Sequence, residues 1–313
     1  MPEPAAPRKI VVTGATGFVG AAVVPVLVGR GDAVTVLSRD ADRARAQLGV
    51  DAVTAALETP GPWTAALAGA HAVIHLAGAS IAEARLDARH KQRVRDSRVE
   101  STRVIVEAIG ALPAADRPRA LIVASGIDYY PYAPDSDYDD DEVTERDPPG
   151  DSFLARVCRD WEAEATAATA LGVRVAQLRT GLVLGPGGGL AKLIAPFKAY
   201  VGGRLGHGRQ WVGWIHRADA AAVYALAAID ERYAGPINLV TGAVRNAELA
   251  RAVGAALGRP SWLPVPAFAL RAAVGELAES LLAGRRVVPA RLTELGFRWR
   301  YPTLAEALAA RDA

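Results

Sequence analysis

The hydrophobic residues of the first half of the chain fall into short continuous runs, and longer amphipathic segments separate them. The runs predict strands at Lys9–Thr13, Ala33–Leu37, Val50–Ala55, His71–Leu76, Ala120–Ala124 and Val173–Leu178. The amphipathic segments predict helices, the clearest being Phe18–Val28, Asp87–Ala111 and Phe153–Leu171. Apolar strands joined by helical crossovers are typical of a parallel sheet covered on both faces. We therefore expect an α/β fold built on a doubly wound parallel sheet.

The pattern loosens after about Gly185, where glycine, proline, tryptophan and arginine mix with short helices. One strand is expected at Pro236–Val240, and helices at Ala247–Leu257, Ala267–Leu282 and Thr303–Ala310. We expect residues 8–185 to form a cofactor-binding domain. Residues 186–313 should form a smaller C-terminal α+β lobe, with parts of 217–240 returning to the first domain.

The stretch from Tyr132 to Asp151 interrupts this order. It contains the acidic run from Asp135 to Glu145 and few apolar residues that could pack. We expect a solvated surface loop here. The alternative is a lid over the cleft between the two lobes.

The first expected strand ends in a glycine-rich turn that leads into a helix. After Ile10-Val11-Val12 the chain reads Thr13-Gly14-Ala15-Thr16-Gly17-Phe18-Val19-Gly20. The first glycine permits the tight turn, the second lets the backbone approach a pyrophosphate, and the third lets the helix pack close to the sheet. The helix N-terminus offers free N–H groups and a positive dipole end to the anion. This predicts a Rossmann dinucleotide site; the alternative is a turn with a structural role alone.

The end of the second strand indicates which dinucleotide is bound. NAD-specific folds usually place an acid there for the ribose 2′-hydroxyl, whereas this chain has Ser38 and Arg39. A guanidinium can bind a 2′-phosphate with charge-assisted bonds worth about 1.5 to 3 kcal/mol. We predict NADP(H) as the cofactor; the alternative is that Arg39 is a solvated surface residue.

Composition excludes several classes of protein. The net charge is +2, and without a basic stripe with interleaved aromatics no nucleic-acid partner is expected. No apolar stretch reaches the length of about 18 residues that a transmembrane helix needs, and Met1–Pro7 does not introduce a signal-peptide core. Cys158 is the only cysteine, which excludes an internal disulfide and a cysteine-cluster metal site. We expect a cytoplasmic monomer or homodimer without membrane partner or metal.

The motifs together resemble the extended branch of the short-chain dehydrogenase/reductase superfamily. Besides the glycine turn, the marks are His75-Leu76-Ala77-Gly78, Val123-Ala124-Ser125 and Leu178-Arg179-Thr180-Gly181. Within it the chain closely resembles an atypical sugar-nucleotide epimerase-like family, an NAD-dependent epimerase/dehydratase family with a C-terminal domain of unknown function. Its further marks are Arg95-Asp96-Ser97-Arg98, Cys158 to Glu162, Gly208-Arg209-Gln210-Trp211, Trp214-Ile215-His216 and Gly296-Phe297 to Tyr301-Pro302.

The resemblance covers about Ile10 to Leu308 and, with the glycine turn, implies a set of cofactor contacts. These are Gly14, Thr16, Gly17, Phe18, Val19, Gly20, Ser38, Arg39, Leu57, Leu76, Ala77, Gly78, Ala124 and Gly181.

The resemblance also implies a catalytic set that this chain holds only in part. In catalytic relatives a Ser or Thr after the fifth strand works with a Tyr-x-x-x-Lys, in which Tyr is the acid or base and Lys lowers its pKa and holds the nicotinamide ribose. Ser125 matches the first member. Counted from Glu162, the Tyr position holds Leu154 and the Lys position holds Cys158. No tyrosine in the chain is followed four residues later by lysine, so ordinary epimerase chemistry needs a substitute acid or base.

Several residues could supply that substitute. Tyr129 or Tyr130 could present a phenol near the nicotinamide, although aromatic residues here commonly only wall the pocket. Cys158 could act as a thiol, but a single cysteine on an apolar helix face is usually a packed hydrophobe. His216 could shuttle protons, yet its place between a strand and a helix start favours a structural role.

Arg209, in the second lobe, and Tyr130 are the candidates for substrate contact. The alternative for Arg209 is that it only stabilises its loop. We expect an NADP(H)-binding oxidoreductase or nucleotide-sugar epimerase-like protein that lacks the usual dyad. Its substrate would be a small molecule, either a small polar compound or a nucleotide-linked sugar, and Ser125 would polarise the reacting oxygen. The alternative is a non-catalytic NADP(H)-binding redox sensor.

Overall fold

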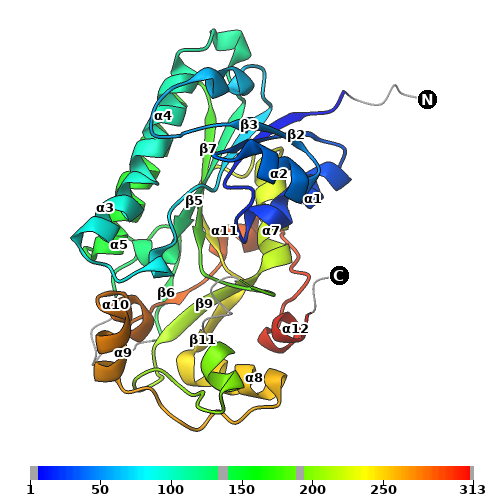
Figure 1. Ribbon diagram of the computed structural model, residues 1–313. Helices are drawn as coiled ribbons and strands as arrows, with labels where there is room; N and C mark the ends of the chain where they lie inside the picture. The colour runs from blue at the N-terminus through cyan, green and yellow to red at the C-terminus, as the bar shows by residue number, and fades with distance from the viewer. Residues whose placement is uncertain (1–5, 133–139, 188–193, 311–313) are drawn as a thin grey trace.

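The fold is organised around one large parallel sheet, in a computed structural model that describes residues 6–132, 140–187 and 194–310. Seven strands pair in parallel in the order β10-β7-β5-β4-β1-β2-β3 (Figure 1). Their bounds are β1 Lys9–Thr13, β2 Ala33–Ser38, β3 Asp51–Thr54, β4 Ala72–His75, β5 Ala120–Gly126, β7 Arg174–Thr180 and β10 Gly235–Leu239. The expected doubly wound α/β fold is confirmed.

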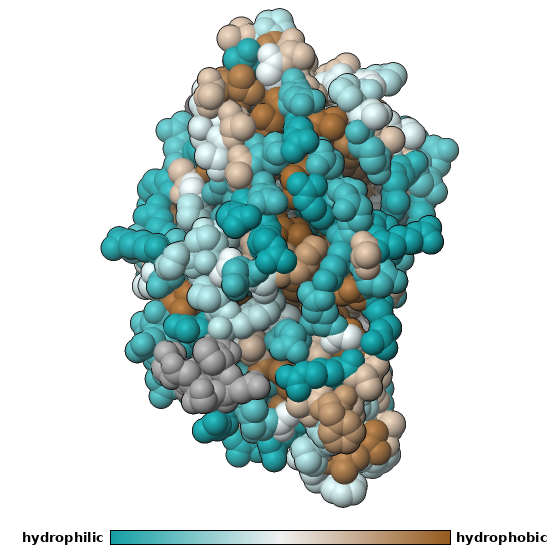
Figure 2. Space-filling model, turned by 90° about the vertical axis from the view of Figure 1, so that its left-hand side faces the viewer, coloured by the Kyte–Doolittle hydropathy of each residue, from teal (hydrophilic) through white to brown (hydrophobic). Residues whose placement is uncertain are grey.

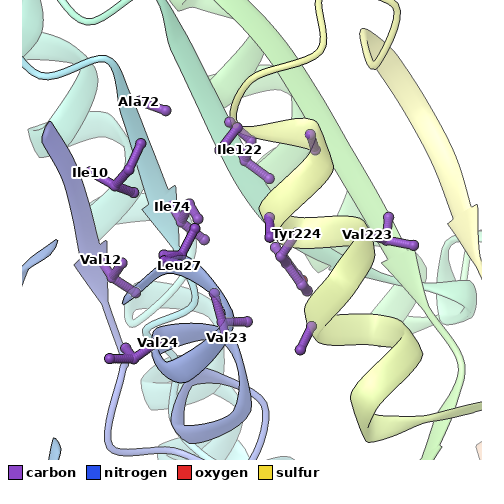
Figure 3. Close-up of a cluster of buried hydrophobic side chains, with 14 of the residues drawn as sticks. Ile10, Val12, Val23, Val24, Leu27, Ala72, Ile74, Ile122, Val223 and Tyr224 are labelled. Atoms are coloured by element: carbon purple, nitrogen blue, oxygen red, sulfur yellow. The ribbon is translucent and has the colours of Figure 1, made fainter. Parts of the chain in front are cut away.

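Helices cover both faces of this sheet, as the continuous apolar strands predicted. Helices α1 (Gly20–Gly29), α2 (Ala41–Leu48) and α7 (Arg217–Ala227) lie on one face, and α4 (Val99–Gly110) and α5 (Phe153–Thr166) on the other, with α3 (Ala88–Asp96) beside them (Figure 1). Figure 3 shows the first face, where Val23, Val24 and Leu27 of α1 lie against Ile10 and Val12 of β1. Burying side chains of this kind contributes about 1.5 to 3 kcal/mol each.

Strand register brings the carboxyl ends of the central strands to one edge. Thr13, the last residue of β1, lies opposite Leu37 of β2 and His75 of β4. The chain order reverses between β1 and β4, because β2 and β3 lie on one side of β1 while β4, β5 and β7 lie on the other. In open α/β sheets ligands bind at such a reversal, outside the carboxyl ends of the strands.

The C-terminal region adds a second, smaller group of elements below the large sheet (Figure 1). A three-stranded sheet has the order β11-β9-β8, with β8 Leu182–Leu184, β9 Trp211–His216 and β11 Gly242–Arg245. Around it are α8 (Asn246–Leu257), α9 (Ala267–Val274), α10 (Leu277–Leu282) and α12 (Leu304–Ala309). Helix α11 (Ala290–Glu294) instead returns to the large sheet, where its Leu292 is fully buried in the core of the first face.

The end of the acidic stretch packs more tightly than its composition suggested. Residues 133–139 of that stretch lie outside the described residues, but β6 (Glu142–Val143) pairs with β12 (Arg286–Val287). The Glu145 carboxylate is buried and accepts hydrogen bonds from the backbone N–H groups of Asn238 and Arg291, at 2.9 and 3.2 Å. A charged residue is buried here because two backbone donors, at β10 and at the start of α11, need an acceptor.

The face that carries α3, α4 and α5 is mainly hydrophilic, with hydrophobic side chains visible between the polar ones (Figure 2). Among the described residues, no helix combines the length and the apolar character needed to cross a bilayer.

Candidate functional site

The glycine turn between β1 and α1 is closed by backbone contacts that leave no room for side chains. Gly14 has a φ of +66°, and a Cβ there would lie 2.6 Å from the Ala77 nitrogen. A Cβ on Gly20 would lie 2.4 Å from the Gly14 carbonyl oxygen. The turn is therefore pressed against the segment after β4, and α1 is pressed against the turn. Both positions need glycine for physical reasons, as the motif predicted.

The amides at the start of α1 remain available to a ligand. Gly17 N–H donates to the Gly14 carbonyl, but those of Phe18, Val19 and Gly20 donate to no acceptor in the described part of the chain. No side chain caps α1 and no acidic residue lies in its first turn. Thr16 and Gly17 are exposed at the tip. This arrangement fits an anion such as a pyrophosphate.

A buried hydrogen-bond chain fixes the turn to β4. The Thr13 hydroxyl lies 2.7 Å from His75 Nδ1 and accepts from the backbone N–H groups of Leu76 and Ala77, and His75 Nε2 lies 3.0 Å from the Ser101 hydroxyl. Ser101 donates its proton to the Ser97 carbonyl, so His75 must donate from Nε2 and accept at Nδ1. Burial, and then the charge of Arg98, lower the pKa of His75 to about 3. The imidazole is therefore neutral and orients the Thr13 hydroxyl, which in turn holds Leu76 and Ala77 in place.

Ser38 and Arg39 lie at the same sheet edge, just after the position of Leu37 opposite Thr13. The Ser38 hydroxyl donates to the Asp40 carbonyl at 3.0 Å, and the Arg39 side chain is exposed. Asp40 caps α2 by accepting from the Arg43 N–H. The Asp40 carboxylate therefore serves the helix, and Arg39 is an accessible cation two residues beyond the position opposite Thr13.

The segment after β4 is held by the junction of α3 and α4. Ala79 N–H donates to the Ser97 hydroxyl at 2.9 Å, and Arg98 Nη1 donates to the Ala79 carbonyl at 3.0 Å. The Arg98 guanidinium reaches Gly78, because a Cβ on that glycine would lie 3.2 Å from Arg98 Cζ. In the sequence, Arg98 is visible only as part of the family mark Arg95-Asp96-Ser97-Arg98. The Arg-Asp-Ser-Arg run at a helix junction was the signal that could have singled it out.

Ser125, at the end of β5, is joined to a buried ion pair. Its hydroxyl donates to Glu162 Oε1 at 2.7 Å, and Glu162 pairs with Arg179 of β7. Arg179 also donates to the Tyr130 hydroxyl at 2.9 Å, and that hydroxyl donates to Asn238 Oδ1 at 2.6 Å. Burial raises the pKa of Tyr130 to about 12. In this arrangement the Ser125 proton and the Tyr130 hydroxyl both serve internal partners.

Cys158, in the lysine position of the resemblance, lies against Ser125 and the Gly126 backbone. Burial raises its thiol pKa to about 12, with Asp128 and Glu162 adding to the shift. Asp128, on the short 3₁₀ turn after β5, accepts from the hydroxyls of Tyr132 and Ser280 at 2.8 and 2.7 Å. Ser280 belongs to α10, so this carboxylate links the sheet edge to the C-terminal region. Sequence reasoning missed Asp128, which directly precedes the two candidate tyrosines.

Tyr129 faces a different surface from the glycine turn. Arg179 Cζ lies 3.4 Å from the centre of the Tyr129 ring. Together with Glu162 and Gln177, Tyr129 lines a groove of about 830 Å³. This groove runs along β7 and the start of β10. The structure therefore places Tyr129 beside the Glu162–Arg179 ion pair, in the groove that both residues of the pair also line.

The remaining predicted contact residues belong to several different elements. Leu57 follows β3 and packs half-buried against the core under α4 and α5. Ala124 precedes Ser125 in β5, and Gly181 follows β7, where a Cβ would lie 2.6 Å from the Gly213 carbonyl oxygen. Arg209 is exposed before β9 on the small sheet, whereas Ser125 is the second-last residue of β5 on the large one.

Phe18 and His216 join the turn to the C-terminal region. The Phe18 ring would contact a Cβ on Gly185, and Arg217 Cζ lies 5.0 Å from its centre. His216 is buried, caps α7 by accepting from the Ala218 N–H and packs against Tyr301. These contacts agree with the structural role that the sequence favoured for His216.

Comparison with known proteins identifies the family. Residues 10–239 match the NAD dependent epimerase/dehydratase family, and residues 265–310 match a domain of unknown function, DUF1731. The chain belongs to the NAD dependent epimerase/dehydratase family. It is 38% identical over 308 residues to the epimerase family protein SDR39U1 homolog, chloroplastic, of Arabidopsis thaliana, covering 96% of this chain and 85% of the relative. The resemblance that the motifs predicted is confirmed.

Solved structures of the epimerase family agree with the fold. The human epimerase family protein SDR39U1, solved with NADPH, superposes with a TM-score of 0.81 at 31% identity, over 96% of this chain and 98% of that one. A nucleoside-diphosphate sugar epimerase of Corynebacterium glutamicum gives a TM-score of 0.76 at 31% identity, over 97% of this chain and 58% of that one. The cofactor bound by the human relative is the one that Ser38 and Arg39 predicted here.

Proposed function

We propose that this protein binds NADP(H) across the carboxyl edge of the large sheet and acts as an epimerase-like oxidoreductase. The observation that carries the proposal is the glycine turn, where Gly14 and Gly20 close against backbone and the three amides that lead into α1 have no acceptor in the described chain. The pyrophosphate would rest on these amides, and the 2′-phosphate would meet Arg39. The NADPH of the human relative supports the same assignment.

When bound, such a cofactor supplies hydride transfer. The chain's own contribution would be to hold the turn through Thr13 and His75 and to bind a small polar or nucleotide-linked substrate between the sheet edge and the C-terminal region. Ser125 would offer a lone pair to that substrate, because its proton is donated to Glu162. Asp128 adds a carboxylate at the same strand end.

Cofactor choice can be tested by titrating the purified protein with NADPH and NADH. Arg39→Gln should weaken NADPH binding about 10- to 100-fold, because charge-assisted bonds to the 2′-phosphate are lost, and should leave NADH binding unchanged. Arg45→Gln, on the exposed side of α2, is the matched control and should bind NADPH normally. Equal affinity of the unaltered protein for NADH and NADPH would contradict the assignment.

Turnover requires a separate experiment. Sugar nucleotides and small carbonyl compounds, offered with NADPH, should include one that changes the nicotinamide absorbance at least transiently. If none reacts or binds, the enzymatic part of the proposal fails while cofactor binding stands.

A second candidate function is a non-catalytic NADP(H) sensor. It is favoured by two groups near Ser125, since Cys158 occupies the lysine position with a thiol pKa of about 12 and the Tyr130 hydroxyl already contacts Arg179 and Asn238. A sensor should change shape or partner binding between NADPH and NADP⁺ without turnover. Identical protease sensitivity and association in the two cofactor states would exclude it.

A further inference from the structure

Arg98 carries hydrogen-bond donors that have no acceptor in the described part of the chain. Its guanidinium has five N–H donors. Nη1 donates to the carbonyls of Ala79 and Val94, both at 3.0 Å, and lies 3.5 Å from the Ser97 hydroxyl. Nε and Nη2 donate to no acceptor in residues 6–132, 140–187 and 194–310. Donors of a half-buried cation are normally paired, so these are candidates for ligand contact.

The position of this guanidinium places it in the dinucleotide cleft. It touches Gly78 directly after β4, and its charge acts on His75 at the end of that strand. On the other side it is close enough to interact electrostatically with Cys158 of α5 and Asp128 after β5. Arg98 therefore lies where the carboxyl ends of β4 and β5 meet, on the far side of β1 from Arg39.

The direction of the cofactor follows from the sheet order. With the pyrophosphate at the turn after β1 and the 2′-phosphate at Arg39 after β2, the adenosine half lies over β2. The nicotinamide half must then extend the other way, over β4 and β5. Its ribose carries two hydroxyls, which can accept hydrogen bonds from a guanidinium.

We propose that Arg98 is a positioning residue that binds the nicotinamide ribose through Nε and Nη2. This inference rests on the proposed NADP(H) binding. It assigns a cation to the part of the cleft where Cys158 provides only a neutral thiol.

A merely structural role for Arg98 is the main rival explanation. Ser97 and Arg98 together clamp Ala79, one at its N–H and the other at its carbonyl. The loss of Arg98 could thus loosen the segment after β4 and disturb the whole turn. Ser97→Ala weakens the same clamp without removing a charge, so it is the matched structural control. Arg95→Gln removes a cation of the same helix junction that pairs with Glu100, and it controls for net charge.

The experiment compares two ligands on the full chain. NADPH carries the nicotinamide ribose, whereas adenosine 2′,5′-bisphosphate carries only the adenosine and 2′-phosphate end. Arg98→Gln should weaken NADPH binding about 10- to 100-fold and leave the bisphosphate unchanged. Ser97→Ala and Arg95→Gln should bind both ligands within about twofold of the unaltered protein.

Each other outcome has a distinct meaning. Normal NADPH binding by Arg98→Gln overturns the proposal. An equal loss of both ligands in Arg98→Gln also overturns it, since the arginine would then act through the turn. Failure of the unaltered protein to bind either ligand would instead refute the proposed function on which the inference rests.

Discussion

Glu162 and Arg179 form a bidentate ion pair inside the protein, in which Nε donates to Oε1 at 2.9 Å and Nη2 to Oε2 at 2.8 Å. The pair joins α5 to β7 and receives the Ser125 hydroxyl on the same carboxylate. The pKa of Arg179 is raised by its bonds to Glu162, against the effect of burial. The position of Ser125 in β5 is thus fixed by its hydrogen bond to the Glu162 carboxylate of α5.

Breaking this pair should destabilise the protein strongly. Glu162→Gln leaves the Arg179 charge buried without its counter-ion, and we expect a loss of about 3 to 5 kcal/mol in the free energy of unfolding. Glu164→Gln, two residues along α5, disrupts the half-exposed pair with Arg103 and should destabilise the protein far less, because solvent screens exposed pairs. Urea denaturation of both variants measures the difference. Similar losses in the two would contradict the assigned role of Glu162.

Stability should depend on pH through His75. Its pKa is about 3 in the folded protein, against about 6.5 unfolded, so the unfolded chain binds the proton more readily between these values. The stabilisation is complete above about pH 6.5 and is lost as pH falls toward 3, by about 1.4 kcal/mol per pH unit at most. His75→Asn should remove this component of the slope. Chemical denaturation between pH 4 and pH 8 tests it, and parallel slopes in the two proteins would refute the assignment.

The glycine turn should reject side chains where the backbone is closest. Gly20→Ala places a Cβ 2.4 Å from the Gly14 carbonyl oxygen, and we expect about 1 to 3 kcal/mol of destabilisation with loss of NADPH binding. Gly29→Ala, at the other end of α1, meets nothing within 4 Å and should stabilise the helix by about 0.5 to 1 kcal/mol. Thermal melts with and without NADPH separate the two effects. Normal NADPH binding by Gly20→Ala would count against the turn as the pyrophosphate site.

Cys158 should react slowly despite its place at the sheet edge. A thiol with a pKa of about 12 holds roughly a thousandfold less thiolate at pH 8 than a free cysteine, so alkylation should slow at least in that proportion. The matched control is the same chain unfolded in urea. Rapid alkylation by iodoacetamide in the folded state would revive Cys158 as a nucleophile.

The parts of the site that sequence could predict are those encoded locally. The turn from Gly14 to Gly20 and the residues after β2 lie within one strand-turn-helix unit, so spacing alone indicates their arrangement. The fold class was likewise predictable, because continuous apolar strands such as β4 and β5 indicate a sheet that is buried on both faces.

The missed features depend on contacts between distant segments. Arg98 contacts Gly78 only because the α3–α4 junction packs against the segment after β4. The hydrophobic pattern of the sequence does not predict this contact. Glu145 looked like part of a solvated acidic run until the N–H groups of Asn238 and Arg291 supplied its partners. Burial of a charge is decided by where its donors come from, and single-sequence patterns do not contain that information.

The return of α11 to the large sheet has a consequence for how the chain can be divided. Leu292 is fully buried in the core beneath α1 and α7, and the Asn238 side chain donates to the Val288 carbonyl at 3.0 Å. A shortened polypeptide ending near residue 264 would therefore keep the dinucleotide motif, yet it would lose Leu292 from this core and remove one of the two backbone donors of the Glu145 carboxylate. The two matched family regions thus share one core, in which the tail of unknown function completes the interior of the nucleotide-binding half.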